Sequence, residues 1–155
     1  MDFLPLLLLA PILVATAYFD LRYMRIPNWL VLAAVALFAL SMPVLDWPEI
    51  AARLTASGLV FAAGAALFAL RLFGGGDVKM MAALMLFVPS SNYTIFALGF
   101  SVAMLAGMAT VFALRQVPLL GHSSWVALRG KGTFPMGVSI AGCGLLHPLA
   151  VQLFG

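Results

Sequence analysis

Charged residues are scarce in this chain of 155 residues: only 8% are Asp, Glu, Lys or Arg, where a soluble domain carries roughly 25%. Cysteine is nearly absent as well, because Cys143 is alone, which excludes an intrachain disulfide and a metal site built from several cysteines. The few basic residues are scattered and form no stripe that could bind nucleic acid. Hydrophobic residues make up 65% of the chain. This balance predicts a membrane protein with a single transmembrane domain over residues 1–155.

The hydrophobic residues form long continuous runs without the period-2 alternation of barrel strands, which favours membrane-spanning helices. A bilayer core of about 30 Å requires about 20 apolar residues per helix. The sequence therefore predicts an all-α polytopic membrane protein with about six transmembrane helices, the fourth of them short for a full crossing. The approximate spans are Phe3–Phe19, Asn28–Leu45, Leu54–Leu72, Val78–Val88, Tyr93–Leu114 and Phe134–Phe154.

The distribution of Lys and Arg predicts the orientation of these spans. With the N-terminus outside, seven of the eight cations fall in the three inner loops and only Arg53 lies outside. Such enrichment marks the cytoplasmic side of a membrane protein, provided that the fourth segment crosses. The inner loop between the fifth and sixth spans, Arg115–Phe134, is the longest, and we expect it to contain a short helix near Trp125. It is also the best candidate for a gate to substrate.

Two of the five acidic residues, Asp20 and Asp77, fall on the predicted cytoplasmic side, each at the end of a span. Two carboxyl groups a few ångströms apart share one proton and titrate as a pair. The ionised member can then take a proton from water while the protonated member polarises a peptide carbonyl. The pair therefore predicts a site that activates water without a metal or a cofactor.

Three glycines, Gly74, Gly75 and Gly76, directly precede Asp77. Glycine can adopt positive φ and allows close approach of another chain, so we expect this turn to let Asp77 reach Asp20. Asp77 opens a helix and Asp20 closes one, so the helix dipoles predict that Asp77 is the more acidic and Asp20 more often holds the shared proton. Taken singly, the two acids also fit simpler interpretations as a helix cap and a charge at the membrane surface.

Three stretches of the sequence resemble the type IV prepilin peptidases. "FDLRYMRIPNWL" resembles the segment of their first aspartate, "GGGDVKMMAAL" their Gly-x-Gly-Asp motif, and "FPMGVSIAG" the Pro-x-Gly segment that opens their last helix. The resemblance implies that Asp20 and Asp77 are the catalytic residues. The supporting or substrate-binding residues that it implies are Arg22, Pro27, Asn28, Gly74, Gly75, Gly76, Lys79, Pro135 and Gly137.

This resemblance implies a membrane aspartic endopeptidase that removes the short basic leader from prepilins or pseudopilins at the cytoplasmic face of the bacterial inner membrane. Its partners would be the prepilin substrate and the lipid bilayer, with no nucleic acid, metal or cofactor. Larger family members carry Cys-x-x-Cys motifs and also N-methylate the trimmed pilin. Because this chain has a single cysteine, we expect no methyltransferase activity. The short form is similar to the peptidase of tight-adherence (Flp-type) pilus systems.

Two other functions are compatible with the same two acids. One is a small proton-coupled carrier or channel that uses Asp20 and Asp77 as a relay. Carriers place ionisable groups near the bilayer midplane, whereas these two are predicted at the cytoplasmic boundary. The other is a non-catalytic assembly subunit in which both acids cap helices.

Overall fold

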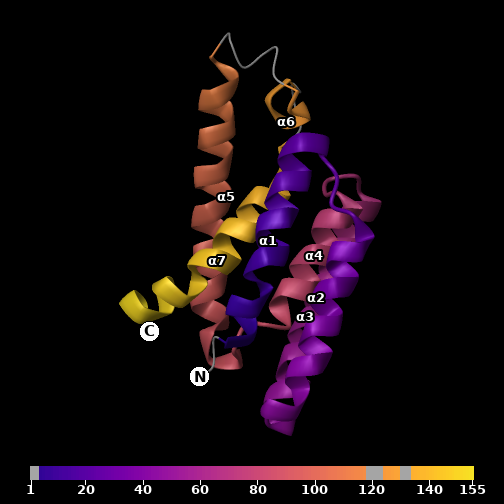
Figure 1. Ribbon diagram of the computed structural model, residues 1–155, viewed down its shortest axis with the longest axis vertical. Coiled ribbons are helices and arrows are strands. Elements are labelled where there is room, and N and C mark those ends of the chain that lie inside the picture. The colour runs from indigo at the N-terminus through magenta and orange to yellow at the C-terminus, as the bar shows by residue number, and fades with distance from the viewer. Residues whose placement is uncertain (1–3, 118–123, 130–133) are drawn as a thin grey trace.

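The computed structural model describes residues 4–117, 124–129 and 134–155, and in those ranges the ordered elements are all helical (Figure 1). The helices, in chain order, are α1 (Leu4–Tyr23), α2 (Asn28–Ser41), the 3₁₀ helix η1 (Met42–Val44), α3 (Trp47–Ala69), α4 (Gly75–Met85), the 3₁₀ helix η2 (Ser90–Asn92), α5 (Tyr93–Arg115), α6 (Val126–Arg129) and α7 (Met136–Phe154).

Four helices of the described part are long and apolar enough to cross a membrane. They are Pro5–Tyr23, Trp47–Ala69, Ser90–Arg115 and Met136–Phe154. Large apolar side chains such as Leu40 and Leu105 are exposed along the helices, as expected where a surface faces lipid rather than water. The protein is therefore an all-α polytopic membrane protein. The predicted count of six spans further requires that α2 and α4, which are shorter, also cross.

The predicted spans coincide with α1, α2, α3, α4, α5 and α7, with one large difference at the start of α3. This helix begins at Trp47, seven residues before the predicted Leu54. The segment containing Pro48 lay between two predicted spans, but proline is well tolerated in the first turn of a helix, where its missing N–H has no intrahelical partner. The short helix expected near Trp125 is confirmed as α6.

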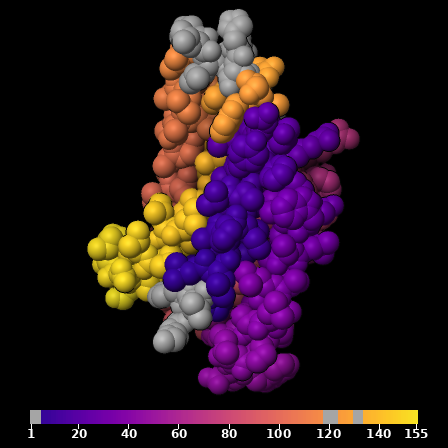
Figure 2. All heavy atoms as spheres, viewed as in Figure 1, coloured from indigo at the N-terminus to yellow at the C-terminus, as the bar shows by residue number. Residues whose placement is uncertain are grey.

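The short helix α4 occupies the interior of the bundle. It packs against α3 and also contacts α2 and α7, while α1 packs against α7 and α2, and α5 packs against α7. In Figure 1, α2, α3 and α4 lie on one side of α1 and α7, and α5 lies on the other. Figure 2 shows α1 across the front of the molecule and the C-terminal part of α7 protruding from its side. Residues 82–89 are all buried. A helix of eleven residues is thus enclosed by longer ones.

A partly buried ion pair between Arg53 and Glu49 holds the chain where α4 ends. Arg53 of α3 is 2% exposed, and its Nε donates a 2.7 Å hydrogen bond to Oε1 of Glu49. Its Nη1 donates to the carbonyl oxygen of Leu86, just beyond α4, and Glu49 accepts hydrogen bonds from the backbone N–H and the hydroxyl of Ser90. Backbone groups within a membrane must find partners inside the protein. Arg53, the one cation predicted on the outer side, therefore supplies a hydrogen-bond donor to the backbone that follows α4.

Candidate active site

Asp20 lies in the last turn of α1 and is 4% exposed. Directly after it the chain turns: Met24 adopts a left-handed conformation with φ of 52°, and its N–H donates to the carbonyl oxygen of Asp20. Pro27, in an extended conformation, then forms the N-cap of α2. The turn closes α1 and leaves the carboxyl group of Asp20 free to face another helix.

That other helix is α7. The backbone N–H of Gly137 donates a 2.6 Å hydrogen bond to Oδ2 of Asp20, and the backbone N–H of Val138 is a second donor. The first N–H groups of a helix have no intrahelical partner, and the N-cap of α7 is Pro135, which has no side-chain acceptor to offer them. Asp20 therefore caps α7 from a distance of 117 residues along the chain.

Gly137 must lack a side chain for this arrangement to form. A Cβ atom at this position would lie 2.9 Å from both Cβ and Oδ2 of Asp20. Carbon atoms that are not bonded approach no closer than about 3.5 Å without repulsion. The glycine thus lets α7 present its N–H groups directly to the carboxylate.

Asp77 is the third residue of α4, whose N-cap is Gly74. Its carboxyl group accepts a hydrogen bond from the backbone N–H of Gly74, as the acidic residue of a capping box does. A side chain on Gly74 would collide with Oδ2 of Asp77. The simple interpretation of Asp77 as the N-cap is therefore wrong, because Gly74 holds that position and Asp77 supports it from the first turn of α4.

The two aspartate segments meet at Gly76. A Cβ atom on Gly76 would lie 3.1 Å from Cβ of Ile26 and 3.3 Å from its carbonyl oxygen, so the start of α4 lies directly against the turn between α1 and α2. Positive φ, which the sequence argument assigned to this glycine turn, is absent there; the non-glycine residues Met24 and Arg71 have it instead. The glycines serve close packing.

The carboxyl groups of Asp20 and Asp77 are close enough to interact electrostatically. Asp77 lies outside the four helices that are long enough to span a membrane, and burial together with the negative charge of Asp20 raises the pKa of its carboxyl group to about 7. The structure thus brings together the two acids that the sequence analysis paired, from α1 and α4, with α7 as a third contributor.

The basic residues predicted to support the site, Arg22 and Lys79, form hydrogen bonds with residues other than Asp20 and Asp77. Nζ of Lys79, which is exposed, donates a 3.1 Å hydrogen bond to Oδ1 of Asn28 and so links α4 to α2. Nε of Arg22 donates to the hydroxyl of Tyr23, and its guanidinium group lies 5.6 Å from the centre of that ring. Asn28 is the first residue of α2 and directly follows the N-cap, Pro27. These residues stabilise the surroundings of the two acids.

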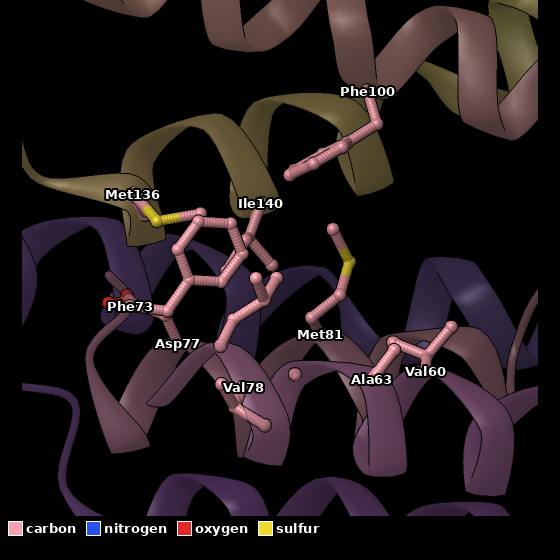
Figure 3. Close-up of a pocket in the computed structure, with 11 residues that line it drawn as sticks. Val60, Ala63, Phe73, Asp77, Val78, Met81, Phe100, Met136 and Ile140 are labelled. Carbon is pink, nitrogen blue, oxygen red and sulfur yellow. The ribbon is translucent and has the colours of Figure 1, made fainter. Parts of the chain in front are cut away.

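A cavity of about 210 Å³ adjoins Asp77 (Figure 3). Figure 3 shows the ring of Phe73 pointing toward Met136 and Ile140 at one end, with Phe100 on the far side. These lining residues could not be identified from sequence, because apolar side chains do not stand out in a chain that is 65% hydrophobic. The only local signal was the proximity of Phe73 to the glycine turn.

The helix α6 closes the same end of the bundle. Nε and Nη2 of Arg115 donate to the carbonyl oxygen of Ala127, and the ring of Trp125 meets that of Tyr18 edge-on at 6.2 Å. The rest of the predicted gate, residues 118–123 and 130–133, lies outside the described residues. Within the ranges that the structure describes, no group of three His, Cys, Asp or Glu side chains is placed to hold a metal ion.

A comparison with known protein families identifies the family to which this chain belongs. The model of the type IV leader peptidase family matches residues 7–120, most of the chain and both aspartates. The chain therefore belongs to the type IV leader peptidase family, whose members are peptidases. No curated protein and no solved structure matches it. The family match ends before α7, so the contribution of Gly137 rests on the structure.

Proposed function

We propose that this protein is an aspartic endopeptidase that removes the short basic leader from prepilins or pseudopilins, with Asp20 and Asp77 as its catalytic pair. The observation that carries the proposal is the meeting of the two carboxyl groups at one electrostatically coupled site, where burial and Asp20 together raise the pKa of Asp77 to about 7. Two carboxyl groups in such a site retain one proton between them near neutral pH.

The hydrogen bonds favour a proton on Asp77, the reverse of the expectation from sequence. Asp20 accepts hydrogen bonds from two N–H groups at the start of α7, where the helix dipole also favours negative charge. Asp77 accepts from the single N–H of Gly74 and is exposed to the charge of Asp20. Asp20 is therefore the base and Asp77 the acid.

Hydrolysis then needs only these two groups and one water molecule. The carboxylate of Asp20 takes a proton from water as the water oxygen attacks the scissile carbonyl carbon, and Asp77 donates its proton to the carbonyl oxygen. When the tetrahedral intermediate collapses, the C–N bond breaks. Asp20 passes its proton to the leaving amine, and Asp77 recovers one from the collapsing hydroxyl group.

The cleaved bond lies at the cytoplasmic face of the bacterial inner membrane. Six spans with the N-terminus outside put both acids on the side of the membrane that holds most of the cations, which is the cytoplasmic side by the positive-inside rule. The enzyme trims the leader without methylating the product, as expected for the short form of the family, and residues 1–155 act as one peptidase domain within the bilayer.

Co-expression with a candidate prepilin tests the proposal. Asp20→Asn and Asp77→Asn should each abolish leader removal, scored as a mobility shift on a gel, while the protein still inserts in the membrane. Asp46→Asn is the matched control, because this exposed N-cap of α3 lies away from the site and should cleave normally. Leader removal at the normal rate by either of the first two variants would refute the pair. Proton transport by the purified protein in liposomes would instead support a carrier.

A further inference from the structure

An apolar groove leads away from the candidate active site between α3 and α5. These two helices pack mainly against α4 and α7, respectively, rather than against each other. The cavity beside Asp77 is followed by a second one of about 390 Å³. The two cavities share the lining residues Val60, Met81 and Phe100, so they adjoin each other along α4 and are together called the groove.

The groove has a floor, two walls and two distinct ends. Met81 and Met85 of the short helix α4 form the floor, α3 forms one wall, and α5 with the start of α7 forms the other (Figure 3). Asp77 lies at one end and Tyr93 at the other, and every other lining residue is apolar. The groove therefore connects a carboxyl group of the site to the apolar interior of the membrane.

The dimensions of the groove suit a helix. Its wall on α3 extends from Ala56 to Leu67, a stretch of helix about 18 Å long, or just over three turns. Small side chains on both walls, Ala56, Ala63 and Ala97, permit the close approach that helices use to pack within a bilayer. Without water there, an occupant must satisfy its own backbone groups, as a helix does.

We propose that this groove binds the apolar helix that follows the leader in the prepilin-type substrate of the proposed function, and that this helix lies alongside α3 and α5 on α4 with its cytoplasmic end at Asp77. The proposal rests on the proposed function and specifies how the substrate reaches the site. The continuity of the groove with Asp77 selects this occupant, because a helix seated there delivers the bond at its end to the acid. The proposal also accounts for the short length of α4, since a longer helix would occupy part of the space in which the substrate helix lies.

Photocrosslinking at two neighbouring alanines of α3 tests the proposal. Ala63 lines the groove, whereas Ala62 is also exposed but lines neither cavity. A photoreactive benzoylphenylalanine is placed at one position or the other in an Asp20→Asn background, so that the substrate is not consumed. The probe is a peptide with a short Lys-rich leader, a glycine and about 20 apolar residues, in vesicles of phosphatidylethanolamine and phosphatidylglycerol.

Position 63 should give several-fold more peptide adduct than position 62, with the link in the first three turns of the apolar helix. Equal adducts at both positions, adducts confined to the leader, or adducts with lipid or a second copy of the protein at position 63 would each overturn the proposal. The result does not depend on the acids being catalytic. If Asp20→Asn still cleaves, the proposed function fails alone, and if cleavage stops but position 63 finds no peptide helix, the groove proposal fails alone.

Discussion

Replacing Gly137 with Ala tests the role of α7 in the candidate active site. The added Cβ would lie 2.9 Å from Cβ and Oδ2 of Asp20, so the N–H of Gly137 must move away from the carboxylate, to which it now donates at 2.6 Å. A hydrogen bond to a charged group contributes about 1.5–3 kcal/mol. Loss of this bond destabilises the ionised form of Asp20 by that amount, so the fraction of enzyme with Asp20 ready to act as the base, and with it kcat, should fall by up to about 10- to 150-fold, since each 1.4 kcal/mol corresponds to tenfold.

The assay is cleavage of the prepilin-type peptide in vesicles, with Gly142→Ala as the control. Gly142 lies in the same helix, and a Cβ there meets nothing within 4 Å. Both substitutions gain the same helix propensity, up to about 1 kcal/mol, so general effects on α7 cancel in the comparison. Equal kcat for the two variants, with both proteins folded, would refute the claim that α7 holds Asp20 in its working state.

Three further results are expected. Gly76→Ala should lower kcat, because the added Cβ separates the start of α4 from Ile26. Gly75→Ala should have a smaller effect, because its Cβ would meet only a movable aromatic ring at 3.3 Å. Equal rates for the two variants would contradict this packing. Arg53→Met should lower the free energy of unfolding by about 1–3 kcal/mol, measured by thermal unfolding in detergent, because Glu49 and the carbonyl of Leu86 lose their charged donor; an unchanged Tm would contradict it. The rate should fall as the pH rises through the pKa of Asp77, about 7, since the acid then loses the proton that catalysis needs; a rate that rises over that range would count against it.

The helices could be predicted from sequence because a continuous apolar run has few alternatives in a membrane. The start of α3 was missed because Trp47 and Pro48 are as typical of a turn as of the first turn of a helix. The end of α4 was predicted three residues late, since Leu86 and Val88 continue the apolar run and the hydrogen bond from Arg53 to Leu86 depends on tertiary packing.

The pairing of Asp20 with Asp77 could be predicted because acids are so rare that few combinations exist. The proposed proton assignment differs from the one expected from sequence for a physical reason: from sequence, only the dipole of the helix to which each acid belongs can be weighed. Asp20 ends α1 but faces the start of α7, and no local pattern reveals a cap supplied from so far along the chain. The groove was missed for a related reason, because it consists of space between helices and not of any distinctive residue.

Infrared difference spectroscopy of the protonated carboxyl group measures the proton that the two acids share. Just below neutral pH, the wild-type protein should show the C=O absorption of a buried protonated carboxyl group. This absorption should be lost in Asp77→Asn and retained in Asp46→Asn. A spectrum without that absorption, or one in which it persists unchanged in Asp77→Asn, would contradict the account.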